Sequence, residues 1–232
     1  MSLPFYVSPE QIAQDKAEFA RKGIARGKSI VVLEYEGGVL LMAENPSSLS
    51  KVGEIYDRIA FAGVGKFSEF DALRKQGVRF ADVRGYAYSR EDVQAKALAN
   101  WYSQGIGEEF ARAMKPLEVE VLVAEVGDER LAGHERNAIY RVSFDGSISD
   151  HRNHCVIGGS VENLERHLQA NYRPDLPLGE ALQLGKATLE RAENGAPQLG
   201  IENLEVCLLD KTRPNRKFRR LSADEVRGIL GA

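Results

Sequence analysis

The chain has 232 residues, which suits one large domain or two small ones, and no linker rich in Pro, Ser or Gly divides it. Its hydrophobic content of 43% and charged content of 28% are ordinary for a globular protein that buries a substantial core. A formal net charge of -3 gives no general reason to expect nucleic acid or an anionic membrane as a partner.

The first predicted helix follows an aromatic tail, residues 1–7, that has no hydrophobic period. Ser8 supplies a hydroxyl N-cap and Pro9 occupies the first helical position. The side-chain pattern continues this helix from Ser8 to about Arg21, and we expect it to stop near Gly23. A capped helix therefore precedes the first strand.

A tight hairpin follows that helix. Ser29 to Tyr35 is rich in β-branched and apolar residues, Gly37-Gly38 tolerates positive φ, and Val39 to Ala43 is a second apolar run. The hairpin is the expected centre of a sheet. A loop from Asn45 to Ser50 ends it, because Asn-Pro and a Ser cluster disfavour regular structure.

The rest of the chain alternates pairs of helices with runs of strands, judged by helical spacing and by short apolar runs bounded by turn residues. The predicted strands are Arg58 to Val64, Val119 to Val126, Ile139 to Phe144, His154 to Ile157, Leu204 to Leu209 and Lys217 to Arg220. The predicted helices are Lys66 to Gly85, Arg90 to Met114, Ser160 to Tyr172, Pro177 to Arg191 and Ala223 to Leu230.

This order of elements predicts the fold class. Two pairs of helices separated by runs of strands disagree with a doubly wound sheet, in which strand and helix alternate one for one. An α+β fold built as a four-layer αββα sandwich fits the order better. We therefore expect two sheets that face each other, each with a pair of helices on its outer side.

Three local patterns that can carry chemistry also have simpler structural explanations. Gly23 to Ser29 resembles a phosphate-binding loop, but it has three residues between its glycines instead of four, and a strand follows it. His151, His154 and Cys155 lie close enough for metal ligation, yet the spacing of the other histidines supplies no fourth ligand. Gly158-Gly159-Ser160 ahead of a helix can bind an anion, although a strand-to-helix turn also needs glycines.

No GxSxG, HExxH, CxxC or paired-carboxylate signature is present in the sequence. By local motif the chain is not an enzyme. We accordingly expect no catalytic residue, no metal and no cofactor.

Cysteine usage and the N-terminus indicate a reducing compartment. Cys155 and Cys207 both lie in apolar, strand-like runs, which favours buried thiols over a disulfide. The segment MSLPFYV lacks the basic and long apolar regions of a signal peptide, and no stretch approaches the ~18 apolar residues of a membrane-spanning helix. A cytoplasmic location is expected.

Several short segments together resemble the signature of proteasome α-type subunits. They are Ser8-Pro9-Glu10, Glu18-Phe19-Ala20, Gly27-Lys28-Ser29, Gly38-Val39-Leu40-Leu41, Lys51-Val52 and Gly63 to Phe67. The strings ENPSSLSKVGEIYDR, GKFSEFDALR and RFADVRGYAY are similar in particular to the actinobacterial α subunits. Ile201 to Asp210 and Arg219 to Leu230 keep the same register, so the resemblance covers nearly the whole chain. The family fold is the αββα sandwich of the N-terminal nucleophile hydrolases.

The resemblance implies a non-catalytic subunit of a threonine-type endopeptidase complex. In the related β subunits the first strand begins with a threonine exposed by autocleavage, whose hydroxyl is the nucleophile and whose α-amine is the base. Here the corresponding neighbourhood is Gly27-Lys28-Ser29, and a capped helix occupies the segment that processing would have to remove. The alternative is an autonomous N-terminal nucleophile hydrolase with Ser29 exposed by processing.

The resemblance also implies a docking pocket between neighbouring α subunits. Lys51 matches the lysine that pairs with the C-terminal carboxylate of an activator ring, and Glu18, Gly27, Gly65 and Lys66 fall where the family lines the same pocket. A charge-assisted hydrogen bond of this kind is worth about 1.5–3 kcal/mol. Several such contacts made by one ring strengthen docking by multivalency. Without the resemblance, Lys51 is interpreted as a solvated loop lysine.

A second implied site is a gate. Its residues are Ser2, Leu3, Pro4, Phe5, Tyr6 and Val7, with Pro9 at the turn that is displaced on opening. Short tails that converge on a ring axis can block a pore by their bulk. The sequence departs from the archaeal and eukaryotic pattern, because it has no Tyr-Asp-Arg triplet and no Tyr-Gly-Gly ahead of Lys115-Pro116. Residues 1–7 are thus the expected gate tail, and residues 8–232 a single proteasome α-type domain.

The partners follow from the same resemblance. Seven copies are expected to form the outer ring at each end of a stack whose inner β rings cut peptides. The partners are neighbouring α subunits, catalytic β subunits, the C-terminal tails of an AAA-type ATPase activator, and unfolded protein substrates. Ring closure needs a heterologous contact, so we expect the helix from Ser8 to pack partly on a neighbouring α chain. The outer face of the helix from Lys66 to Gly85 is the expected contact with β subunits.

Overall fold

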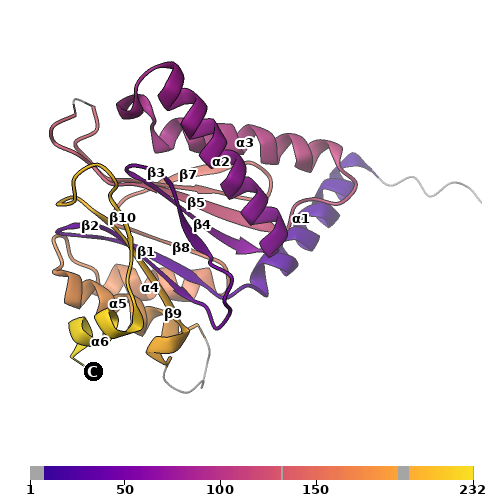
Figure 1. Cartoon of the computed structure of the whole chain (residues 1–232). Helices are drawn as coiled ribbons and strands as arrows, with labels where there is room; N and C mark the ends of the chain where they lie inside the picture. The colour runs from indigo at the N-terminus through magenta and orange to yellow at the C-terminus, as the bar shows by residue number, and fades with distance from the viewer. Residues whose placement is uncertain (1–7, 132, 193–198, 232) are drawn as a thin grey trace, which may run out of the picture.

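The computed structural model describes residues 8–131, 133–192 and 199–231, and the predicted gate segment, residues 1–7, lies outside this part of the chain. Within it, two antiparallel sheets of five strands each lie face to face (Figure 1). In spatial order, sheet A contains β10 (Phe218–Arg220), β9 (Leu204–Asp210), β2 (Gly38–Glu44), β1 (Ile30–Tyr35) and β8 (His154–Ile157). Sheet B contains β3 (Val52–Tyr56), β4 (Ile59–Gly65), β5 (Val119–Glu125), β6 (Ala138–Val142) and β7 (Ile148–His151).

Helices cover the outer faces of both sheets (Figure 1). The α-helices are α1 (Pro9–Ala25), α2 (Phe67–Ala87), α3 (Ala95–Arg112), α4 (Val161–Asn171), α5 (Leu178–Glu190) and α6 (Ala223–Leu230). α2 and α3 pack on sheet B, whereas α4 and α5 pack on sheet A and α6 lies against α5. The four-layer αββα sandwich predicted from the order of elements is confirmed.

Side chains of the β1–β2 hairpin are buried alternately on the two faces of sheet A. The cross-strand pair Val32 and Leu41 packs between the sheets, and the next pair, Leu33 and Leu40, packs against the helices outside. Fully burying one such side chain stabilises the fold by about 1.5–3 kcal/mol before conformational entropy is counted. Because both faces are buried, the two strands read as nearly continuous apolar runs.

α1 closes one end of the sandwich, where it contacts β4 and β5 (Figure 1). The backbone N–H of Gln11 donates to the Ser8 hydroxyl at 3.2 Å, which is the predicted N-cap. Ile24 inserts into the core between the two sheets. The prediction that this helix stops near Gly23 is wrong, since it continues to Ala25. Burial of Ile24 holds the last turn against the core, and tertiary packing of this kind supplies most of a helix's stability.

The two edge strands of sheet B, β3 and β7, are absent from the sequence prediction. β3 mixes charged and apolar residues, and its register shifts between Glu54 and Tyr56, which interrupts the alternation of side chains. β7 exposes most of its side chains and has Ile148 as its one aliphatic residue. Because an edge strand is paired on one side only, it tolerates polar side chains and lacks a hydrophobic signature. The predicted helix from Arg90 begins only at Ala95, after a short 3-10 turn, η1 (Arg90–Asp92).

Gly38 is required by the close approach of β2 and β9. Its φ is +144°, and a Cβ atom there would lie 2.0 Å from the backbone oxygen of Leu209. A backbone atom in a central strand cannot move aside as a flexible side chain can.

We expect Gly38→Ala to lower the free energy of unfolding by at least about 2 kcal/mol, through backbone strain and the clash with β9. Gly105→Ala is the matched control, because Gly105 lies exposed on α3 with nothing within 4 Å of an added Cβ. The control should be neutral or stabilising by up to about 1 kcal/mol. Urea unfolding followed by circular dichroism measures both variants, and equal stability of the two would contradict the assignment.

Candidate functional site

Lys51 is anchored where the chain crosses from sheet A to sheet B. Its side chain is half-buried, and its ammonium donates hydrogen bonds to the backbone oxygens of Lys28 at 2.9 Å and Glu44 at 3.0 Å. These carbonyls lie where β1 begins and β2 ends. An ammonium has three donors, and two of them are engaged by these hydrogen bonds within the described chain.

Burial lowers the pKa of Lys51 to about 8. The carboxylates of Glu44 and Glu205 act in the opposite direction, and the charge of Lys28 adds to the effect of burial. At neutral pH the group is still mainly protonated, so it presents a positive charge in a partly dry setting. A carboxylate that binds there gains more from the charge than it would at a fully hydrated lysine.

Gly27, which directly precedes the Lys28 carbonyl bound by this lysine, lies against Gly65. A Cβ atom on Gly27 would lie 2.5 Å from Cγ1 of Val64 and 3.2 Å from the backbone nitrogen of Gly65. Gly65 itself has a φ of +106°, and a Cβ there would lie 1.9 Å from the backbone oxygen of Glu118. Both positions therefore need glycine, and together they bring the residues before β1 against the end of β4.

The other two predicted pocket residues make contacts elsewhere within the chain. Glu18 pairs with Lys22 at 2.6 Å on the exposed side of α1, and this pairing lowers the pKa of the Glu18 carboxyl. Lys66 pairs with Glu69 at 3.0 Å. No hydrogen bond or ion pair within the described residues joins Glu18 or Lys66 to Lys51. The structure of one chain thus brings Gly27 against Gly65 and ties Lys51 to the carbonyl of Lys28, and the pocket as a whole stays a prediction.

Ser29 is sealed inside the fold. Its side chain is 2% exposed, and its hydroxyl donates to the backbone oxygen of Gly158 at 3.0 Å. A Cβ atom on Gly159 would lie 2.3 Å from the Ser29 hydroxyl oxygen, so the turn before α4 covers the group closely. α1 precedes it in sequence and closes the same end of the sandwich. A nucleophile has to reach its substrate, and this hydroxyl does not meet that requirement.

The histidines and cysteine considered as metal ligands point to different places. His154 bonds through Nδ1 to Glu165 at 3.1 Å, and His151 bonds through Nε2 to the hydroxyl of Ser149 at 2.8 Å. Cys155 faces the core between the sheets. Successive side chains of a strand point to opposite faces, so these groups do not converge. Across residues 8–131, 133–192 and 199–231, no cluster of three His, Cys, Asp or Glu residues is placed to hold a metal ion.

The glycine motifs also have structural roles. Gly158 and Gly159 both have positive φ, 73° and 61°, and turn the chain from β8 into α4. The N–H of Gly158 donates to the buried carboxylate of Glu120 at 3.2 Å, so it is already engaged. Residues 23–29 form the end of α1 and the entry to β1. Residues 23–29 therefore do not form a phosphate-binding loop, and the N–H of Gly158 is not free to bind an anion.

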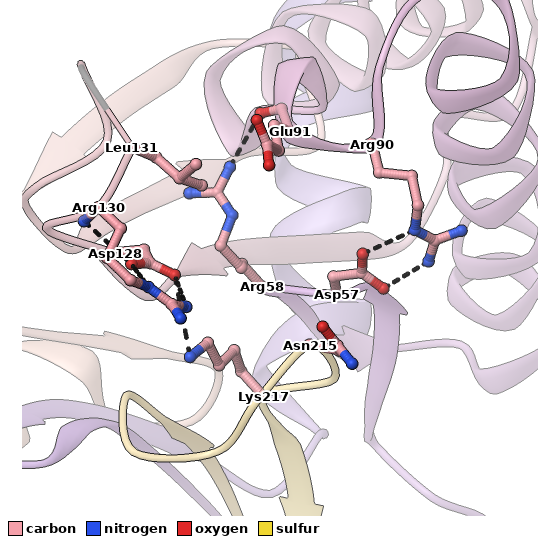
Figure 2. Close-up of a pocket in the computed structure, with 9 residues that line it drawn as sticks. All are labelled: Asp57, Arg58, Arg90, Glu91, Asp128, Arg130, Leu131, Asn215 and Lys217. Carbon is pink, nitrogen blue, oxygen red and sulfur yellow. Dashed lines mark hydrogen bonds and ion pairs between the residues drawn. The ribbon is translucent and has the colours of Figure 1, made fainter.

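A cavity of about 750 Å³ lies among the η1 turn, the β3–β4 turn and the chain before β10 (Figure 2). Arg90 donates two hydrogen bonds to Asp57, at 2.9 and 2.5 Å, and Arg130 donates two to Asp128, at 2.8 and 2.6 Å. Hydrogen bonding to Arg130 lowers the pKa of Asp128 far below its usual range. Carboxylates held by arginine in this way are poor proton acceptors, so the cavity does not have the features of an acid–base centre.

Comparisons with known proteins identify the family of this chain. The family model described as "Proteasome subunit" matches residues 24–209. The chain belongs to the proteasome subunit family. A relative from Xylanimonas cellulosilytica named proteasome subunit alpha is 52% identical over 230 residues, which cover 95% of this chain and 93% of the relative.

Two other relatives are also named proteasome subunit alpha. The relative from Saccharopolyspora erythraea is 49% identical, with 99% of this chain and 89% of the relative covered. The one from Acidimicrobium ferrooxidans is 48% identical, with 100% and 97% covered. The resemblance to actinobacterial proteasome α-type subunits is thereby confirmed. Measured on the described residues, none of the helices combines the length and the apolar character needed to cross a membrane.

The surroundings of Lys51 include residues that the sequence did not reveal. The carboxylate of Glu205 on β9 accepts the N–H of Lys51 at 2.9 Å and of Val52 at 3.1 Å. Lys51 and Glu205 are 154 positions apart in the sequence. No local motif marks Glu205, because its role depends on which strands the two sheets place side by side.

Proposed function

We propose that the chain is the non-catalytic α subunit of a proteasome core particle. It forms the outer seven-membered rings, gates entry to the proteolytic chamber of the β rings, and docks an AAA-type ATPase ring. The match to the proteasome subunit model and the relatives named proteasome subunit alpha support this role. We also propose a cytoplasmic location, which the two free, buried thiols of Cys155 and Cys207 favour.

The observation that carries the docking proposal is the state of Lys51. Its ammonium is half-buried, fixed by two carbonyls, and has one donor left. A fixed charge with a single available donor is suited to one oxygen of a terminal carboxylate. Gly27 directly precedes the Lys28 carbonyl that holds this ammonium, and it packs against Gly65. Glu18 and Lys66 complete the pocket in this proposal when neighbouring subunits meet.

The non-catalytic role is supported by Ser29. In the alternative, an autonomous N-terminal nucleophile hydrolase, this hydroxyl and a newly freed α-amine would have to face substrate. Ser29 is instead buried beneath Gly159 and bonded to a backbone oxygen. Processing before it would remove α1, whose residue Ile24 packs in the core between the sheets.

Exposed apolar side chains support contacts with other subunits. Ile12 and Phe19 on α1 are each 46% exposed, and we propose that this side of α1 packs on the neighbouring α subunit. Val83 and Tyr86 on α2 are 69% and 94% exposed. We assign this outer face of α2 to the contact with β subunits. Large apolar groups rarely gather on a surface that stays in water.

Replacing Lys51 tests the docking proposal. We expect Lys51→Ala to lower ATPase-dependent protein degradation at least about tenfold, because each of the ring's pockets loses its charged donor. Hydrolysis of short peptides by the same particle should be unchanged, since the β subunits are untouched. Lys211→Ala, at an exposed lysine just after β9, is the matched control and should degrade protein normally. Normal protein degradation by Lys51→Ala would exclude this site.

Docking should also depend on pH. The protonated form of Lys51 binds the carboxylate, so docking weakens as pH rises through about 8, the pKa of the free site. Bound carboxylate favours the ammonium, which moves the midpoint upward. The ATPase concentration for half-maximal degradation, measured from about pH 6.5 to about pH 9.5, reports this change. Peptide hydrolysis at each pH serves as the reference, and a flat docking curve would contradict the role of the ammonium.

The gate proposal concerns Ser2 to Val7 and the turn at Pro9. Removing Ser2 to Val7 should raise peptide hydrolysis by the assembled particle several-fold, because the tails no longer obstruct the axial pore. Protein degradation driven by the ATPase should change less, since docking opens the gate in any case. Peptide hydrolysis at the wild-type rate after the deletion would count against a gate in these residues.

A further inference from the structure

The connection from β2 in sheet A to β3 in sheet B, residues 45–51, is called the crossing here, and it depends on one buried carboxylate. Glu205 on β9 is 8% exposed. One of its oxygens accepts the side-chain amide of Asn45 at 2.7 Å and the backbone N–H of Lys51 at 2.9 Å. The other accepts the backbone N–H of Val52 at 3.1 Å. Three donors at both ends of the connection from β2 to β3 therefore converge on a single side chain of another strand.

Arg220 on β10 holds this carboxylate and binds the same crossing. Its guanidinium forms an ion pair with Glu205 and donates a second hydrogen bond to the backbone oxygen of Val52 at 2.7 Å. The Glu205–Arg220 pair thus binds both backbone groups of Val52: Glu205 accepts its N–H, and Arg220 donates to its carbonyl oxygen. A guanidinium with its fixed fork of donors is suited to such a two-point contact.

The crossing is fixed to sheet B as well. The backbone oxygen of Lys51 accepts the N–H of Gly63 at 3.0 Å. With its N–H on Glu205 and its oxygen on β4, the backbone of Lys51 is held from both sides. Its side chain is thereby aimed at the carbonyls of Lys28 and Glu44.

We propose that Glu205 is a positioning residue for carboxylate docking, which it serves by fixing the backbone of Lys51 between the sheets so that the ammonium keeps one directed donor. This inference rests on the proposed docking role of Lys51. Glu205 does not touch the docked tail in this account. It acts through the lysine, and Arg220 keeps its carboxylate oriented.

Glu205→Gln is the informative change. Glutamine keeps the shape of the side chain, but one of its two acceptor oxygens is replaced by an NH₂ group. That NH₂ group then faces donors of Asn45, Lys51, Val52 or Arg220 that the wild-type carboxylate accepts. The crossing is then loosened, and Lys51 moves into water. Glu202→Gln, which removes the charge of an exposed carboxylate just before β9, is the matched control.

The pKa of Lys51 can be measured without any docking assay. Acetic anhydride acetylates only the neutral amine, so the pH dependence of Lys51 acetylation in the assembled particle, followed by mass spectrometry of its peptide, gives the pKa of this lysine. We expect a midpoint near 8 in the wild type and in Glu202→Gln, and a rise toward the ordinary lysine value in Glu205→Gln. Loss of the Glu205 charge alone would lower the pKa of Lys51 further. An unchanged or lower pKa would therefore overturn the proposal.

Docking supplies the second measurement. With the AAA-type ATPase ring from the same cells as probe, Glu205→Gln should raise the ATPase concentration for half-maximal protein degradation about tenfold, with the rate at saturation recovered. In a Lys51→Ala background the same change should add nothing, because Glu205 acts through Lys51. Wild-type docking by Glu205→Gln, or an equal loss in the Lys51→Ala background, would overturn the positioning role.

The design separates this inference from the docking proposal. If Lys51→Ala leaves docking intact while Glu205→Gln still raises the lysine pKa, the docking site is wrong and the positioning of Lys51 stands. Peptide hydrolysis and particle size check assembly of each variant. If Glu205→Gln fails to assemble, Glu205→Asp replaces it, since aspartate keeps the charge but is too short for all four donors. It should shift the pKa and docking in the same directions, and wild-type values for both would overturn the inference.

Discussion

The structure depends on the burial of both faces of each sheet. Strand residues such as Val32 and Leu41 meet the opposite sheet, while their neighbours Leu33 and Leu40 meet the helices outside. Two sheets held together in this way leave their ends open. α1 covers one end by inserting Ile24 between them, and it contacts β4 and β5 there. The same end holds the buried Ser29 at the entry to β1.

The face-to-face arrangement also forces the chain to cross from one sheet to the other, and a crossing carries backbone N–H groups that belong to neither sheet. Burying backbone polar groups without partners costs about 1–3 kcal/mol each. Glu205 accepts the N–H groups of Lys51 and Val52 at the end of the crossing, and Arg220 donates to the backbone oxygen of Val52. Lys51 is held at its N–H, at its backbone oxygen and through two donors of its ammonium. The contacts that complete the crossing therefore also fix this half-buried positive charge.

The polar groups elsewhere in the fold are largely satisfied by one another. In the cavity of Figure 2, the carboxylates of Asp57 and Asp128 are bound by arginines, and in the turn before α4 the N–H of Gly158 is bound by Glu120. Such pairs stabilise loops and turns but leave little reactivity for substrates. The match over residues 24–209 places the chain in the proteasome subunit family.

The sequence by itself determined the sandwich and most of its central elements, because a strand buried on two faces is a continuous apolar run and a helix on a sheet has a fixed apolar period. It also marked Lys51, through a resemblance carried by short motifs spread over the chain. The edge strands β3 and β7 needed the tertiary structure, since exposed edges carry polar residues and a shifted register. So did the role of Glu205, because hydrogen bonds between residues 154 positions apart follow from strand order and not from any local pattern. The packing of the sheets determines which distant donors and acceptors meet, and it thereby sets the environment of Lys51.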